Sequence, residues 1–250
     1  MSSTSPPTRS AQTGGDTSDT VQATIAIDLS LAAFVGIENV TLTGTGAVNA
    51  TGGGVANHLI GNDGANVLDG KGGADILEGG KGNDTYLVDN SADSVIEIAS
   101  GGTDTVKSTV DYALANPFVE NLTLLAGAGA IGGTGNDLAN VVTGNESANH
   151  LDGGNGADTL VGGPGDDIYH RELSPATSSR KPRSAGIDTV QSTAASYTLA
   201  TNVENLVLLA GLRPAAGIRP PTSSRATTPT TRWMARVPPT ASMAARAPTR

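Results

Sequence analysis

Two stretches of the chain repeat a nine-residue unit with an apolar residue at one fixed position. The first stretch reads GGGVANHLI, GNDGANVLD, GKGGADILE and GGKGNDTYL from Gly52, and the second reads GNDLANVVT, GNESANHLD, GGNGADTLV and GGPGDDIYH from Gly135. The eighth position is apolar or tyrosine in every unit: Leu59, Leu68, Leu77, Tyr86, Val142, Leu151, Leu160 and Tyr169. Successive side chains of a strand point to opposite faces. Each unit therefore predicts a short strand whose eighth side chain points inward.

A longer period surrounds these units. The motif Asp-Thr-Val starts at Asp19, Asp104 and Asp188, at intervals of 85 and 84 residues, and a Glu-Asn-apolar motif follows each time, at Glu38, Glu120 and Glu204. The segment from Asp104 to Gly127 alternates apolar and polar residues, with apolar positions at Val106, Val110, Leu114, Leu122 and Leu124. This alternation predicts further strands that continue the repetitive structure.

The first six positions of the nine-residue unit are rich in glycine, and the sixth is an Asx residue. Glycine is frequent at positions one, two and four, where it permits positive φ and lets carbonyl oxygens converge. Position six is always Asp or Asn: Asn57, Asn66, Asp75, Asp84, Asn140, Asn149, Asp158 and Asp167. Calcium takes six to eight oxygen ligands at flexible distances. Carbonyls and a carboxylate in one tight turn are oxygens of that kind.

This pattern resembles the repeats-in-toxin family, whose consensus is G-G-x-G-x-D-x-U-x. The resemblance covers residues 19–170 well and residues 186–211 in part. It implies an all-β fold, a parallel β-roll or β-helix solenoid, with six residues of each unit in a turn and three in a strand. It also implies that two units make one circuit, so that Asn57 lies over Asp75, Asn66 over Asp84, Asn140 over Asp158 and Asn149 over Asp167.

Calcium is the expected cofactor and partner. The predicted ligands are the carboxylates of Asp75, Asp84, Asp158 and Asp167, the paired Asn57, Asn66, Asn140 and Asn149, and the position-one Gly70, Gly79, Gly153 and Gly162. Each pair holds one Asn where the family prefers a second Asp, and Asn adds a carbonyl but no charge. We therefore expect weak binding, with Kd about 10⁻⁴ to 10⁻³ M, and the best sites in the late units. The alternative for each carboxylate is a metal-free Asx turn, and asparagine also stabilises turns unaided.

The charge distribution favours a cation over a polyanion as the partner. The net charge is −9, and between Gly14 and Tyr169 the only basic residues are Lys71, Lys81 and Lys107. Such an acidic segment repels itself, nucleic acid and anionic membranes alike. There are no cysteines, which excludes disulfides and thiolate metal sites. No apolar run reaches the length of a transmembrane segment.

The periods divide the chain into segments. Residues 1–18 are expected to be disordered, and residues 19–103 form a first module with nonapeptides at 52–87. Residues 104–187 form a second module with nonapeptides at 135–170 and an atypical stretch at 170–185, and residues 188–211 begin a truncated third. Residues 212–250 hold seven arginines and no acidic residue, and predict a disordered tail. GC-rich back-translation of this tail and of residues 175–183 in another frame restores repeat-like sequence, which suggests a shifted reading frame.

No catalytic site is expected. The chain has no H-E-x-x-H, no G-x-S-x-G and no phosphate-binding loop. His58 and His150 occupy position seven, so they are expected to point outward into solvent, with zinc binding a lesser alternative. Weak calcium sites fill outside cells, so the protein is expected to be extracellular. Family members are typically exported through a carboxy-terminal signal, and its absence here puts export of this chain in doubt. The alternatives are the carboxy-terminal part of a larger secreted protease, lipase or epimerase, or part of an adhesin or surface-layer protein.

Overall fold

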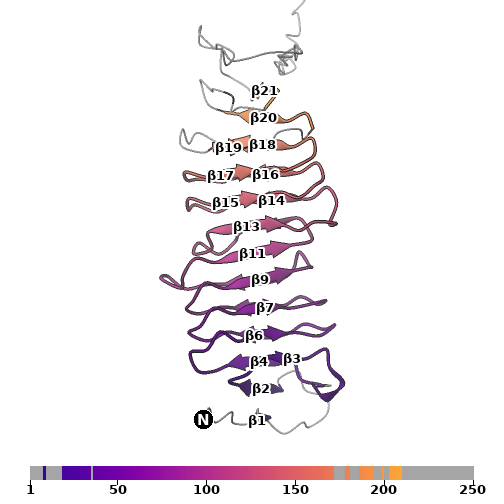
Figure 1. Cartoon of the computed structure of the whole chain (residues 1–250), viewed down its shortest axis with the longest axis vertical. Coiled ribbons are helices and arrows are strands. Elements are labelled where there is room, and N and C mark those ends of the chain that lie inside the picture. The colour runs from indigo at the N-terminus through magenta and orange to yellow at the C-terminus, as the bar shows by residue number, and fades with distance from the viewer. Residues whose placement is uncertain are drawn as a thin grey trace, which may run out of the picture.

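A computed structural model describes residues 8–9, 19–34, 36–171, 178–180, 186–193, 199 and 203–209. Its strands stack one above another along the long axis of the molecule, from β2 near the amino-terminal end to β21 (Figure 1). Among the described strands, every pair is parallel except the pair of residues 8–9 with residues 20–23. The predicted all-β parallel solenoid is confirmed.

The strands form three sheets. The first contains β1 (Thr8–Arg9), β2 (Thr20–Ala23), β4 (Asn39–Leu42), β6 (His58–Ile60), β8 (Ile76–Glu78) and β10 (Ser94–Ile96). The second contains β3 (Ile27–Asp28), β5 (Ala50–Thr51), β7 (Val67–Asp69), β9 (Thr85–Val88), β11 (Thr105–Ser108), β13 (Asn121–Leu124), β15 (Val141–Thr143), β17 (Thr159–Val161) and β19 (Ser178–Arg180). The third contains β12 (Tyr112–Ala113), β14 (Gly132–Thr134), β16 (His150–Asp152), β18 (Ile168–Arg171), β20 (Thr189–Ser192) and β21 (Asn205–Leu208).

The second sheet runs almost the whole length of the roll, whereas the other face is interrupted. Along the chain, strands of the second sheet alternate first with strands of the first sheet and then, from β12 to β18, with strands of the third. Among the described strands, no pairing joins β10 to β12. One face of the roll is therefore a continuous sheet of nine strands, and the opposite face has a seam between β10 and β12.

The register of the paired strands shows that two nonapeptides make one circuit. Leu59 pairs with Leu77, and Leu68 pairs with Tyr86. In the second block Val142 pairs with Leu160, and Leu151 pairs with Tyr169. Every pair is separated by 18 residues, which confirms the expected stacking.

The long-period motifs also form neighbouring strands. The pairs β2–β4, β11–β13 and β20–β21 share one register, in which the Thr of Asp-Thr-Val faces the Asn of Glu-Asn-apolar. The recurring glutamates accept a hydrogen bond from the backbone N–H of the recurring aspartates, at 3.2 Å for Asp19 to Glu38 and 2.8 Å for Asp104 to Glu120. The linking segments therefore continue the solenoid, as their alternation predicts.

The core is a narrow column of side chains between the two faces. All eight residues at position eight of the nonapeptides are at most 1 % exposed. Their strand neighbours Val67, Ile76 and Val141 point outward and are exposed. Each turn buries only one or two large side chains, so the fold depends on stacking against the turns above and below.

The ends of the chain lie mostly outside the described residues, including the expected disordered tail at 212–250, most of 1–18, and most of the atypical stretch at 170–185. Residues 8–9 form β1, which pairs antiparallel with β2 where the sequence predicts disorder, and so covers the otherwise open edge of β2. Within the described residues η1 (Ala32–Phe34) is the one helix, and no helix is long and apolar enough to cross a membrane.

Candidate metal-binding turns

The Asx residues at position six stack into columns on both edges of the roll. The backbone N–H of each Asn donates to Oδ1 of the Asp 18 residues later, at 2.7 Å for Asn57 to Asp75 and for Asn66 to Asp84. The same bond is 2.9 Å long from Asn140 to Asp158 and from Asn149 to Asp167. All four predicted pairs are therefore in contact.

The columns continue past the nonapeptides, which sequence reasoning missed. The N–H of Asp75 donates to Oδ1 of Asp93 at 3.0 Å, and that of Asp84 donates to Oδ1 of Asp104 at 2.7 Å. In the second module the N–H of Asp167 donates to Asp188 at 2.9 Å. Asp93 follows Asp75 by the same 18 residues as the predicted pairs, so its spacing was a usable signal.

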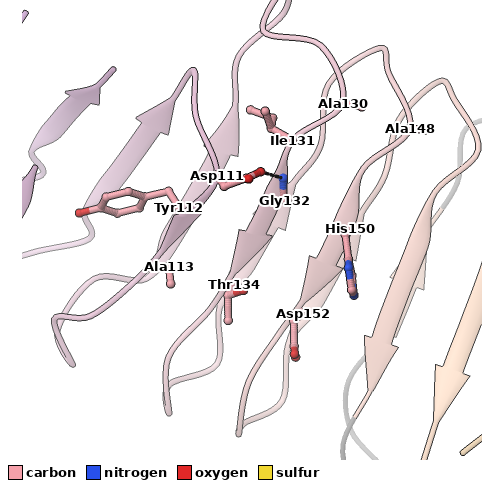
Figure 2. A pocket seen from close by; sticks show the side chains of 10 residues that line it. All are labelled: Asp111, Tyr112, Ala113, Ala130, Ile131, Gly132, Thr134, Ala148, His150 and Asp152. Carbon is pink, nitrogen blue, oxygen red and sulfur yellow. Dashed lines mark hydrogen bonds between the residues drawn. The ribbon is translucent and has the colours of Figure 1, made fainter. Parts of the chain in front are cut away.

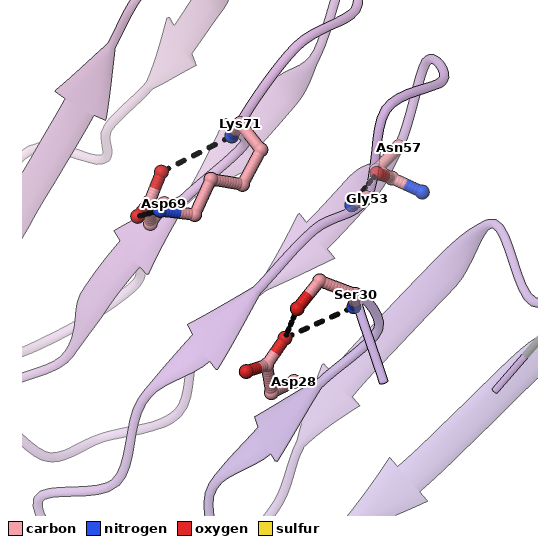
Figure 3. A network of polar contacts seen from close by, with 6 residues as sticks. All are labelled: Asp28, Ser30, Gly53, Asn57, Asp69 and Lys71. Atoms are coloured by element: carbon pink, nitrogen blue, oxygen red, sulfur yellow. Dashed lines mark hydrogen bonds and ion pairs between the residues drawn. The ribbon is translucent and has the colours of Figure 1, made fainter. Parts of the chain in front are cut away.

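The asparagine turns are closed by their own side chains. Oδ1 of Asn57 accepts the N–H of Gly53 at 2.7 Å (Figure 3). Asn66, Asn140 and Asn149 accept the N–H at position two of their own turns in the same way, at 2.8 Å. The amide nitrogens donate to carbonyls of the preceding circuit, as from Asn57 to Glu38 at 3.0 Å. Neutral amide groups thus satisfy these turns.

The aspartate turns have a different backbone. Positions two and four have positive φ in all four: Lys71 at 58°, Gly73 at 146°, Gly80 at 94°, Gly82 at 114°, Gly154 at 73°, Gly156 at 126°, Gly163 at 92° and Gly165 at 114°. Within the four asparagine turns, positions two and four do not have positive φ. This difference explains why Val55, Leu138 and Ser147 are accommodated at position four of asparagine turns. Lys71 is held by Asp69, whose two carboxylate oxygens contact its backbone and side-chain nitrogens at 3.1 and 3.0 Å (Figure 3).

The carboxylates of the aspartate turns are buried. Asp75, Asp84, Asp158 and Asp167 are at most 1 % exposed, and Oδ2 of Asp75 and of Asp84 has no hydrogen-bond partner. A buried charge without compensation is costly. In these turns the position-one glycine lets the carboxylate pack against its backbone, because a Cβ at Gly70 would overlap the side chain of Asp75. A Cβ at Gly79, Gly153 or Gly162 would likewise overlap the carboxylate of the aspartate in its own turn, which is Asp84, Asp158 or Asp167 respectively. A buried carboxylate oxygen without a hydrogen-bond partner suits a hard cation.

Burial also changes the proton affinity of these groups. Loss of hydration raises the pKa of Asp75 and of Asp84 from 3.8 to about 6, although the hydrogen bonds from Asn57 and Asn66 oppose the shift. Neighbouring carboxylates, Asp93 beside Asp75 and Asp104 beside Asp84, raise the pKa further. In the absence of a cation, protons therefore compensate part of the buried charge in weak acid.

We expect the calcium-free protein to be more stable in weak acid than at neutral pH. Asp75 and Asp84 bind protons more tightly in the folded state than in the unfolded chain. Their protonation therefore contributes its full share to folding stability below pH 3.8, and this share is lost as the pH rises through about 6. Thermal melting of calcium-depleted protein between pH 4 and pH 8 should show Tm falling across this range. The variant Asp75→Asn/Asp84→Asn should flatten the profile, and a Tm that rises with pH would contradict the prediction.

Other polar groups lie away from these turns. Asp63 pairs with Lys81 at 2.9 Å on the exposed surface. Nε2 of His58 lies 2.6 Å from Oε1 of Glu78, so this side chain has a protein partner as well as solvent. His150 is exposed, as expected, and its ring centroid lies 6.3 Å from that of His170. A surface pocket is lined by β12, β14 and β16, including Asp111, His150 and Asp152 (Figure 2). It contains none of the predicted ligands.

Comparison with known proteins supports this assignment of the turns. The family model for the RTX calcium-binding nonapeptide repeat (4 copies) matches residues 51–86 and residues 134–169. These are the two blocks that contain the stacked Asn and Asp turns. No significant match was found among curated proteins or among solved structures.

Proposed function

We propose that this chain, whose two blocks are RTX calcium-binding nonapeptide repeats, is an extracellular calcium-binding β-roll that requires the ions to complete its fold. The observation that carries the proposal is the pair of buried, unpartnered Oδ2 atoms of Asp75 and Asp84, each beside a glycine without a side chain. A divalent cation at these positions would neutralise charges for which the protein itself has no described basic partner.

Calcium fits this donor set better than other metals. The turns supply carboxylate and carbonyl oxygens and no sulfur, and the histidines lie on the outer surface. Oxygen ligands at flexible distances are characteristic of calcium, whereas zinc and copper prefer nitrogen and sulfur. Sites of this kind bind calcium weakly, with Kd about 10⁻⁴ to 10⁻³ M, so they fill outside a cell and stay empty in a cytosol. Weak calcium sites of this kind support an extracellular location, which is also typical of RTX repeat proteins.

The proposed role is binding and structural, without catalysis. The aspartate turns carry the charge that ions neutralise, and the asparagine turns close themselves. Calcium would therefore order half of the turns in each block and leave the other half unchanged. Coupling of metal binding to folding is expected where the ligands come together only in the folded chain.

Calcium binding by the full-length protein tests the proposal. Isothermal titration calorimetry of the variant Asp75→Asn/Asp158→Asn should show fewer bound ions than the wild type, because each change removes the charged ligand of one aspartate turn. A matched control is Asp63→Asn/Asp137→Asn, which removes the same charge from exposed residues at position three. This control should keep the wild-type stoichiometry. Equal stoichiometry in all three proteins would overturn the proposal.

A further inference from the structure

Three buried carboxylates meet where the first repeat block ends. They belong to Asp84 in the last nonapeptide, Glu97 just after β10 and Asp104 just before β11, and their exposures are 1 %, 4 % and 0 %. One carboxylate oxygen from each lies within 4.8 Å of the other two. Glu97 and Asp104 lie outside the matched residues 51–86, so the repeat motif does not account for this cluster.

The oxygens of this cluster are only partly satisfied. Oδ1 of Asp104 accepts the N–H of Asp84, and the carboxylate of Glu97 accepts the hydroxyl of Tyr86 and the N–H of Ile98. Oδ2 of Asp84 and Oδ2 of Asp104 are buried without a hydrogen-bond partner. The described ion pairs of the protein include none of the three carboxylates. Two unpartnered carboxylate oxygens beside a third carboxylate are unfavourable unless a positive charge lies between them.

Gly79 permits the close approach of these groups. A Cβ at Gly79 would overlap the carboxylates of Asp84 and Glu97 and the hydroxyl of Tyr86. The absence of a side chain at this position therefore allows two carboxylates and a tyrosine hydroxyl to converge on the backbone of Gly79. Burial raises the pKa of Glu97 to about 7, which shows how poorly the surroundings tolerate its negative charge.

The second module is built differently at the equivalent point. There the hydroxyl of Tyr169 donates to Oδ2 of Asp188 at 3.3 Å, whereas the hydroxyl of Tyr86 donates to Glu97. The strand pairing aligns β19 with β10, since β19 pairs with β17 as β10 pairs with β8. In the sequence, β10 is followed by Glu97 and β19 is followed by Lys181. Among the described residues, a group of three carboxylates is found at the end of the first block.

We propose that Glu97 and Asp104 join Asp84 in binding one calcium ion at the end of the first repeat block. This inference rests on the proposed function and extends the site of the last aspartate turn to two residues outside the nonapeptide motif. Three carboxylates and a tyrosine hydroxyl form an all-oxygen donor set, which suits a hard divalent cation. The ion would join three segments of the chain: the last aspartate turn, the segment after β10 and the start of β11. The site would thereby fasten the repeat block to the linking segment that follows it.

The variant Glu97→Gln tests this proposal in the full-length protein, since it keeps the shape of the side chain and removes its charge. Calcium stoichiometry at saturation should fall by one ion per chain, or the last ion should need at least about tenfold more calcium, because affinity follows ligand charge. The control Glu78→Gln changes the net charge equally at a residue on the outer surface and should match the wild type. Unchanged binding in Glu97→Gln would overturn the proposal.

A crystal of the wild-type protein soaked in terbium gives an independent answer that does not depend on how the variant folds. An anomalous peak between Asp84, Glu97 and Asp104 is expected in addition to peaks at the other aspartate turns. Peaks at Asp75 and Asp158 without one beside Glu97 would refute this site and leave the proposed function intact. Absence of all peaks would count against both.

Discussion

Removal of calcium at pH 7.5 is expected to abolish most of the β-structure of the protein. With Kd about 10⁻⁴ to 10⁻³ M and 10 mM calcium, each filled site stabilises the fold by about 1.4 to 2.7 kcal/mol. The four aspartate turns together would then supply about 6 to 11 kcal/mol. Because whole domains are stable by only about 5 to 15 kcal/mol, loss of this contribution should leave little net stability.

Far-UV circular dichroism of the full-length protein measures this effect. The β signal should disappear on chelation and return when calcium is restored to the millimolar range. Magnesium at the same concentration is the control, and it should restore much less signal because it requires near-ideal octahedral geometry. A β signal that persists in chelator would mean that stacking and the asparagine turns suffice to hold the fold.

Replacement of Gly73 by alanine is expected to destabilise the roll by about 2 to 6 kcal/mol. Gly73 has φ of +146°, a conformation that costs other residues about 1 to 3 kcal/mol. A Cβ at this position would also lie 2.6 Å from the carbonyl oxygen of Val55 in the circuit below. Because that neighbour is backbone in a stacked turn, it cannot move aside, and overpacking adds about 1 to 3 kcal/mol.

The adjacent Gly72 provides a matched control for this experiment. A Cβ at Gly72 would meet no atom within 4 Å, and its φ is not in the left-handed region. Gly72→Ala should therefore be neutral or stabilise the protein by up to about 1 kcal/mol, through the lower entropy of the unfolded chain. Urea unfolding in saturating calcium compares the two variants. Equal midpoints for Gly72→Ala and Gly73→Ala would show that the turns are too loosely stacked for this argument.

The nine-residue period predicted most of the fold. It identified the buried column from Leu59 to Tyr169. The resemblance to the repeats-in-toxin family added that two units make one circuit, and so the 18-residue stacking and the pairing of Asn57 with Asp75. The alternation around Val106 and Leu122 likewise located the strands that continue the roll. Spacing determines which residues stack, and the structure agrees wherever the period is unbroken.

The chemistry of the turns was less accessible from the sequence. Asn and Asp occupy the same position, yet the amide of Asn57 closes its own turn while Oδ2 of Asp75 has no partner. The backbone difference behind this contrast involves φ at positions two and four, and Lys71 shows that a residue other than glycine can adopt it. Glu97 lies off the nine-residue register, so only the folded chain brings it beside Asp84 and Asp104.

The seam between β10 and β12 has a mechanical consequence. In a solenoid, each circuit contacts only the circuits directly before and after it. Mechanical force and cooperative folding therefore pass from one circuit to the next in sequence. At the seam the strands pair through the second sheet, by β9, β11 and β13. Among the described strands no pairing spans the opposite face, where the side chains of Tyr112 and Asn116 donate to the carbonyls of Asp93 and Glu97. A pull along the axis, or a drop in calcium, should therefore separate the roll into two halves that open as units, with this circuit as the hinge.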